Sequence, residues 1–137
     1  MSIPVHAIAS LKAALRAHLL ANADLSSLVG TAIFDAPPRG AAPPYLVLGD
    51  AGARDNGGSG GEGLRIDLDV IAVTSERGTK AALTLASAIE SALRTPLPAL
   101  QGHHLVGLEH RQTTTRHDAA TSLSRATLRL SAFTEPL

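Results

Sequence analysis

The chain has 137 residues, balances 12 basic against 12 acidic side chains, and contains no cysteine. Its length suits one domain, residues 1–137, that buries a core without disulfides or a structural metal. The lack of cysteine excludes disulfides, thiolate–metal sites and a thiol nucleophile. The zero net charge disfavours general affinity for nucleic acid, because nucleic-acid binders usually carry a basic excess.

The N-terminal sequence MSIPVHAIAS lacks the basic start and the long apolar core of a signal peptide. No apolar run approaches the roughly 20 residues that span a bilayer. We therefore expect a soluble, cytosolic protein with no membrane partner.

The first predicted element is an amphipathic helix from about Pro4 to Ala21. Its apolar residues recur at spacings of three and four, the period of one helical face: Ile8, Leu11, Leu15 and Leu19. Residues 22–30 indicate a turn with a short helical segment, and residues 32–34 a short strand. The following run APPRGAAPP excludes helix and central strand and predicts an extended connector, with a polyproline ligand for a partner domain as the alternative.

The stretch from Pro44 to Leu93 predicts a β-hairpin followed by a helix. Residues 45–49 read as a short apolar strand. Residues 64–73 alternate apolar with polar side chains, as a half-buried strand does. Thr74 or Ser75 is predicted to cap the helix, which the prolines of the segment TPLP end.

A glycine-rich segment, about residues 51–63, predicts a long flexible hairpin loop. A phosphate cradle is one alternative, but GxxxxGK[ST] is absent and no predicted helix starts directly after the glycines. Because glycine is costly to order, we favour a loop, centred on Gly57 to Gly61, that becomes ordered against a neighbouring protein.

The C-terminal part predicts two further strands, at residues 105–116 and 126–132, with a tight connection at residues 117–120. Residues from about 134 to 137 predict a loose tail. Together the elements predict an α+β fold in which two helices pack on a mostly antiparallel sheet of four or five strands with a long β-hairpin loop.

Two groups of side chains invite a catalytic or metal interpretation. Asp67 and Asp69 share one strand face, but no nucleophile is indicated nearby, so a solvated or subunit-facing surface is favoured. Four histidines show no HExxH or other ligand spacing: His103, His104, His110 and His117. The last two are an odd number of residues apart, so a regular strand would place them on opposite faces. We expect no catalytic residue, cofactor or metal.

The order of motifs resembles a known family. PPYLVLGD, a glycine-bearing loop, LRIDLDVIAVTSERGTKAALTLASAIESAL, LQGHHLVGL and a final pair of strands are similar to the small tail-completion proteins of long-tailed phages and of phage-derived gene transfer agents, where members act as tail terminators. The resemblance covers about Leu11 to Glu135. The chain departs from the family pattern at Val73, where an aromatic residue is expected, and in its very glycine-rich loop.

The resemblance implies a single tail-terminator-like domain that assembles into a homo-oligomeric ring, typically of six copies. Such a ring caps the tail tube, stops its polymerisation and joins the tail to the head. The implied partners are other copies, the major tail-tube protein and a head-completion or stopper protein, with DNA only passing through the ring lumen. The implied locations are the cytoplasm of the producing bacterium during assembly and the head–tail junction of the particle.

The residues themselves suit such contacts. Two predicted strands carry charged outer faces, and a cyclic ring joins different patches of the same chain. The candidate contact residues are Arg54, Asp55, Arg65, Asp67, Asp69, Arg125 and Arg129.

Two other classes of function stay open. A head-completion or stopper ring has a similar size and the same lack of chemistry. A small metal-dependent hydrolase is the more distant alternative, and it rests on the histidines and on Asp67 and Asp69.

Overall fold

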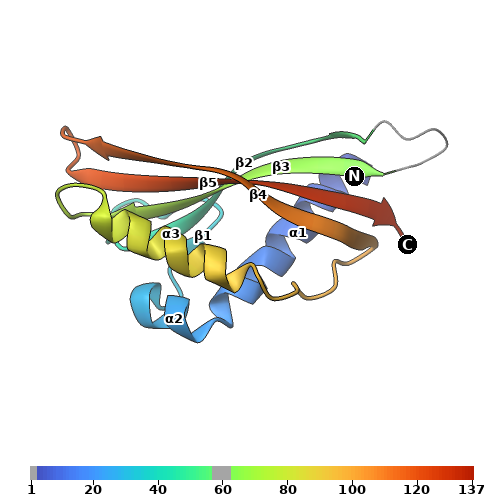
Figure 1. The fold of residues 1–137 in the computed structure, drawn as a ribbon, viewed down its shortest axis with the longest axis horizontal. Coiled ribbons are helices and arrows are strands. Elements are labelled where there is room, and N and C mark those ends of the chain that lie inside the picture. Colours follow the sequence, from blue (N-terminus) through green and yellow to red (C-terminus); the bar gives the residue numbers. More distant parts are fainter. Residues whose placement is uncertain (1–2, 57–62) are drawn as a thin grey trace.

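A computed structural model describes residues 3–56 and 63–137. Within these residues, three helices and five strands follow one another (Figure 1). The helices are α1 (Ile3–Leu20), α2 (Ala23–Val29) and α3 (Lys80–Ala92). The strands are β1 (Ile33–Phe34), β2 (Tyr45–Asp55), β3 (Leu64–Thr74), β4 (His103–Asp118) and β5 (Leu123–Pro136).

The strands form one open sheet in the order β1-β2-β3-β5-β4. Only the short β1–β2 pair is parallel, and the other three pairs are antiparallel. All three helices lie on the same side of the sheet (Figure 1). The predicted α+β class and the mostly antiparallel sheet are confirmed. The short helical segment predicted after Ala21 forms α2, in addition to the two longer helices that were predicted.

The core lies between the helices and one face of the sheet. Alternate residues of β3 and β5 are buried on that face, which is the period-2 pattern expected for a strand with one covered side. The helices pack against these residues through their apolar faces. In α1 the predicted apolar residues Leu11, Leu15 and Leu19 are fully buried. No helix among the described residues is long and apolar enough to cross a membrane.

Helix α3 begins later than the sequence predicts. Thr74 is still paired with Ser124 as the last residue of β3, so it cannot cap a helix. Gly78 then adopts a left-handed φ of 71°, and Thr79 is the residue before the first helical turn. The chain needs this glycine turn because the strand and the helix run in different directions.

Two strands extend further than predicted. β2 continues through the first glycines to Asp55, because Ala51 to Asp55 all pair with β3. β5 continues to Pro136, because the predicted loose tail pairs with the start of β4. The predicted loop is therefore shorter than residues 51–63, and its centre, Gly57 to Gly61, lies outside the described residues.

Strand β4 contains two irregularities, one between Leu105 and Gly107 and one between His110 and Gln112. The second inserts Arg111 as an extra residue, which shifts the alternation of side chains by one. His110 consequently lies opposite Leu130 and His117 opposite Ser124, both on the helix side. The prediction that the two histidines face opposite sides is wrong because of this bulge.

A partly buried histidine pair connects the start of β4 to α1. His6 Nδ1 and His103 Nε2 are 2.8 Å apart, and Ser10 Oγ donates a hydrogen bond to the Gln101 carbonyl at 2.9 Å. One imidazole must donate and the other accept, so the contact needs at least one neutral ring. Burial, with the neighbouring His6, lowers the pKa of His103 below its ordinary value.

This pair predicts acid sensitivity of the fold. His103 binds a proton more readily in the unfolded chain, so the neutral pair stabilises the protein above the ordinary histidine pKa of about 6.5, and that stability is lost as the pH falls through the lowered folded-state pKa. We expect the urea midpoint of His103→Leu to depend less on pH between neutral and mildly acidic buffer than that of the wild type. Parallel curves for the two proteins would contradict this assignment.

Candidate assembly surface

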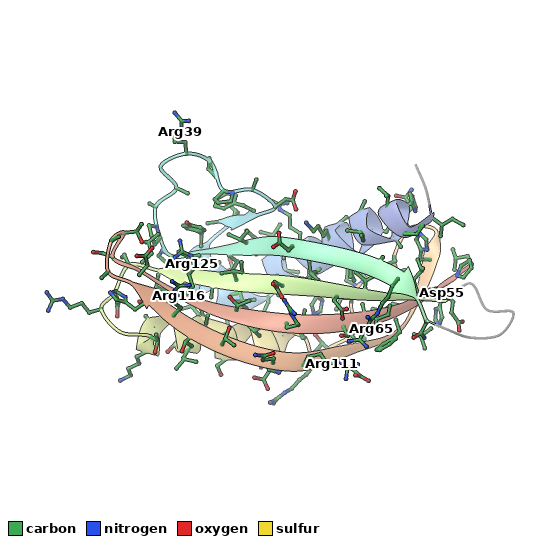
Figure 2. All side chains as sticks on the ribbon, turned by 90° about the horizontal axis from the view of Figure 1, so that it is seen from above. Arg39, Asp55, Arg65, Arg111, Arg116 and Arg125 are labelled. Atoms are coloured by element: carbon green, nitrogen blue, oxygen red, sulfur yellow. The ribbon has the colours of Figure 1, made fainter. Side chains whose placement is uncertain are left out.

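The side of the sheet that faces away from the helices is polar over most of its length, and we call it the open face. One end of it is apolar, with Tyr45, Val47, Ile71 and Val73, of which Tyr45 and Val73 are buried. Figure 2 views the molecule from this side. The remaining part of the open face is formed by alternate residues of four strands: Gly52 and Arg54 of β2, Arg65, Asp67 and Asp69 of β3, Arg125, Thr127, Arg129, Ser131 and Phe133 of β5, and Gln112, Thr114 and Arg116 of β4. Because successive side chains of a strand point to opposite faces, the same alternation that fills the core places these residues outward.

Asp67 is the centre of a polar network on the open face. Its Oδ1 accepts hydrogen bonds from Ser131 Oγ at 2.7 Å and from Arg65 Nε at 3.1 Å. Arg111 Nε in turn donates to Ser131 Oγ at 3.1 Å, and its guanidinium lies 6.0 Å from the Phe133 ring centre. The hydrogen bond from Ser131, with Arg65 adding to it, holds the pKa of Asp67 below its ordinary value.

A second ion pair joins the two central strands further along. Arg129 donates through Nε and Nη2 to the two oxygens of Asp69, at 3.0 and 3.3 Å. The Asp69 side chain is 17% exposed, whereas that of Arg129 is 58% exposed. Such half-open pairs contribute little to stability, so the open face keeps charged groups that can still contact another protein.

Six of the seven candidate contact residues lie on the open face: Arg54, Arg65, Asp67, Asp69, Arg125 and Arg129. The seventh, Asp55, lies at the end of β2 opposite Leu64. The structure thus brings these residues to one side of the sheet, while their role as contacts stays a prediction.

Sequence reasoning missed Asp50, Arg111 and Arg116. Asp50 lies beside Asp67, Asp69 and Arg129, because the irregularity in β2 turns it toward the open face. Arg111 reaches the same face through the bulge in β4. Because a bulge depends on how two strands pair, the local sequence does not indicate the positions of Asp50 and Arg111.

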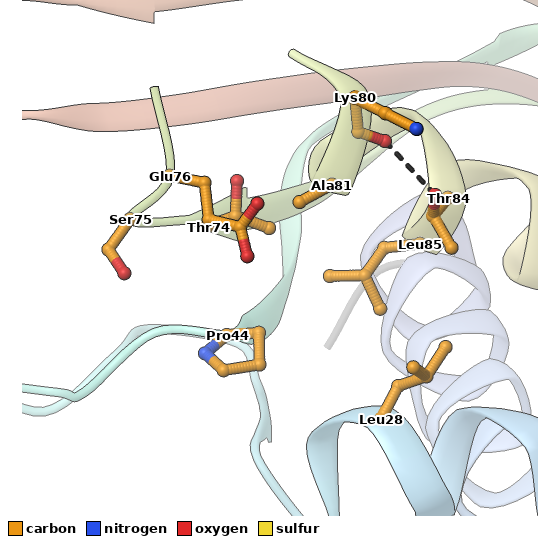
Figure 3. Close-up of a pocket in the computed structure, with 9 residues that line it drawn as sticks. All are labelled: Leu28, Pro44, Thr74, Ser75, Glu76, Lys80, Ala81, Thr84 and Leu85. Atoms are coloured by element: carbon orange, nitrogen blue, oxygen red, sulfur yellow. Dashed lines mark hydrogen bonds between the residues drawn. The ribbon is translucent and has the colours of Figure 1, made fainter. Parts of the chain in front are cut away.

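No group of three or more potential metal ligands occurs among the described residues. A cavity of about 460 Å³ lies between α2, α3 and the end of β3, where Leu28, Pro44 and Leu85 supply an apolar lining and Glu76 and Lys80 two charges (Figure 3). Thr84 Oγ1 only donates to the Lys80 carbonyl at 3.0 Å, as expected within a helix. A nucleophile held by a base and an orienting group is not found among the described residues that line this cavity.

Comparison with known proteins identifies a family and similar solved structures. The family model of the tail completion protein gp17 matches residues 13–135, nearly the whole chain. The chain belongs to this family. The suspected resemblance is confirmed.

The chain is also similar to a chain in the solved structure of the virion of a native gene transfer agent particle. The two share 32% sequence identity with a TM-score of 0.85, and the match covers 94% of this chain and 97% of the other. No curated protein matches. In this member of the tail-completion family the helices cover one face of the sheet, and most of the other face is polar and carries no helix among the described residues.

Proposed function

We propose that this tail-completion protein is a structural component of a phage-like particle that forms a ring, caps the tail tube, ends its polymerisation and joins the tail to the head. The observation that carries the proposal is the family membership over residues 13–135, together with the similarity to a chain of a gene transfer agent virion. The partners are further copies of the chain, the major tail-tube protein and a head-completion or stopper protein, and DNA only passes through the lumen. The protein acts without catalysis, first in the cytoplasm of the producing bacterium and then at the head–tail junction.

The open face supports an assembly role. Because the helices cover one side of the sheet, the other side is a broad surface, and its central strands present both signs of charge. Mixed charges favour specific orientation of a partner more than raw affinity. The seven candidate residues, from Arg54 to Arg129, are therefore proposed as contacts with neighbouring copies or with the tube.

Native mass spectrometry tests the ring directly. With a chain mass of 14.1 kDa, a six-copy ring would have a mass of about 85 kDa. We expect this species either for the purified protein or after addition of the major tail-tube protein. A chain that stays monomeric in both conditions would refute the ring proposal.

Mixing the protein with tail-tube protein also distinguishes the terminator role from the stopper role. A terminator added to polymerising tail-tube protein should cap the tubes and stop their growth, which electron microscopy reads as tubes that carry a ring at one end. A ring that forms but binds only head-completion protein would assign the stopper role instead.

A further inference from the structure

Both edges of the sheet expose strand segments with no partner strand among the described residues. On one side β1 pairs only with Leu46 and Val47, so β2 is uncovered from Asp50 onward. On the other side β4 pairs with β5 alone over its 16 residues. From Glu109 to His117 every β4 residue is exposed. Natural proteins usually protect such an edge with charges, proline or a covering segment.

The unprotected part of each edge is short and regular. In β4 it is Gln112 to Thr115, which is uncharged, contains no proline and begins directly after the bulge. In β2 it is Ala51 to Ala53, small residues that begin directly after the β2 irregularity. An unpaired ladder of backbone donors and acceptors is a template for another strand.

The directions of the two edge strands suit a ring. Strands β2, β3, β5 and β4 alternate in direction, so β2 and β4 run oppositely within one chain. Rotation about an axis along the strands preserves these directions. The β4 edge of one copy therefore meets the β2 edge of the next as an antiparallel pair, which is the more stable arrangement.

Charge selects one register for this pair. With Gly52 opposite Thr114 of the neighbour, Asp50 lies opposite Arg116 and Arg54 opposite Gln112. Side chains of the open face then continue across the junction, since all these residues belong to it. A shift by two residues in one direction would place Asp50 opposite Asp118, and in the other direction would leave Asp50 opposite Thr114.

Both charges are poorly matched within one chain. Arg116 lies opposite Arg125 on β5, and the two are neighbours in Figure 2. Like charges directly opposite each other are destabilising. Asp50 borders the cavity lined by Asp67, Asp69 and Arg129, and the guanidinium of Arg129 is already paired with Asp69. Within the described ranges neither Asp50 nor Arg116 has an ion-pair partner, so each gains one in this register.

The helix layer also fits. Thr113 and Thr115 of β4 lie on the helix side, opposite Leu128 and Ala126, yet both are exposed, so within the described part of the chain this side of β4 is open to a neighbour. Helix α1 lies beyond the outer edge of β2 in Figure 2, and Ala9 and Ala13 are among its exposed residues. A strand added to β2 would lie over this helix, as the inner strands lie over α3.

The register implies a stagger between copies. Gly52 is level with Ser131 of β5, because both are paired through Asp67, whereas Thr114 is level with Thr127, four residues earlier in β5. At about 3.3 Å per residue this is about 13 Å for each repeat of four strands, which is about 19 Å wide. The resulting tilt of about 35° lies within the range of closed barrels.

We propose that neighbouring copies join by pairing residues 50–54 of β2 with residues 112–116 of β4, so that the sheets form one continuous wall around the ring. This inference rests on the ring-forming function proposed above. It identifies the occupant of both free edges as a second copy of the same chain.

Cysteine cross-linking tests the register, because the natural chain has no cysteine. Directly opposed residues of an antiparallel pair have Cα atoms about 4.5–5.5 Å apart, which suits a disulfide. A Cβ at Gly52 meets nothing within 4 Å, and Thr114 is exposed. Within one chain the two positions are three strand spacings apart, about 14 Å, so no internal disulfide can form.

We expect the Gly52→Cys/Thr114→Cys variant, oxidised alone or with tail-tube protein, to give a ladder from dimer to full ring on a non-reducing gel. Each single variant, and the control pair Gly52→Cys/Thr127→Cys, should stay uncross-linked. Dimers from Thr114→Cys alone would show twofold β4–β4 pairing and overturn the proposal. Rings by mass spectrometry without cross-links would also overturn it while leaving the proposed function intact, whereas the loss of all rings in the wild type would refute that function itself.

Charge reversal gives an independent measurement. Arg116→Asp or Asp50→Arg should raise the protein concentration needed for half-maximal ring formation by about tenfold, and the double variant should restore it. Arg39→Asp, an exposed change in the connector, serves as the control. If the double variant needed a concentration raised by the product of the two single effects, the Asp50–Arg116 contact would be ruled out.

Discussion

Replacing Leu128 with alanine should lower the free energy of unfolding by about 2–5 kcal/mol, the range for large-to-small changes in a packed core. Leu128 is fully buried near the middle of β5, opposite Val70 of β3 and beneath the helix layer. The rigid sheet and helix on either side cannot collapse into the space that the shorter side chain leaves, so a cavity remains. Urea unfolding followed by circular dichroism measures the loss.

Thr127→Ala is the matched control for this change. Thr127 is the preceding residue on the same strand but lies half-buried on the open face. Its truncation should cost less than about 1 kcal/mol. Equal losses from the two variants would contradict the assignment of the core to the helix side of the sheet.

Removing the hydroxyl of Ser124 should destabilise the protein by about 1–3 kcal/mol. Ser124 is fully buried, and its Oγ lies 2.6 Å from the Gly78 carbonyl, 3.0 Å from the Glu76 carbonyl and 2.6 Å from His117 Nδ1. The hydroxyl donates to a carbonyl of the turn before α3 and accepts from the histidine. Ser124→Ala leaves these groups without that partner, which should lower the urea midpoint and loosen the turn in hydrogen exchange.

Thr134→Val is expected to stabilise the protein, in contrast to Ser124→Ala. Thr134 is also buried on β5, but its Oγ1 has no hydrogen-bond partner among the described residues. Replacing an unpaired buried hydroxyl by a methyl of similar shape removes a desolvation penalty, so the free energy of unfolding should rise by about 1 kcal/mol. If Ser124→Ala and Thr134→Val shifted the midpoint in the same direction, hydrogen bonding would not be the cause.

Local patterns predicted much of the fold because each depends on neighbours in the chain. The spacing of Leu11, Leu15 and Leu19 identified the buried stripe of α1, and the alternation from Leu64 to Val73 identified a strand with one covered face. The charged residues between those apolar positions, Arg65, Asp67 and Asp69, lie together on the opposite face, as the alternation predicts. Arg54 was predicted in the loop, and it joins this face because β2 extends to Asp55. Such periodicities are properties of the chain itself.

Element ends were predicted less well where a distant strand decided them. Nothing local in the glycine-containing run after Leu48 indicates a strand, yet pairing with β3 extends β2 to Asp55. The C-terminal residues are likewise held by the start of β4. The start of α3 was also predicted too early, because the left-handed conformation of Gly78 in the turn before the helix is not indicated by the local sequence.

The amino-acid sequence by itself determined the classes of element, the apolar and polar faces of the strands, and the tail-completion family. The tertiary structure decided the strand order, which places β5 in the centre and leaves β4 at an edge. It also decided the bulges that turn Asp50 and Arg111 to the open face. The physical reason is that pairing register links residues far apart in the chain, such as Asp67 with Ser131, and no short-range pattern encodes which partner is met.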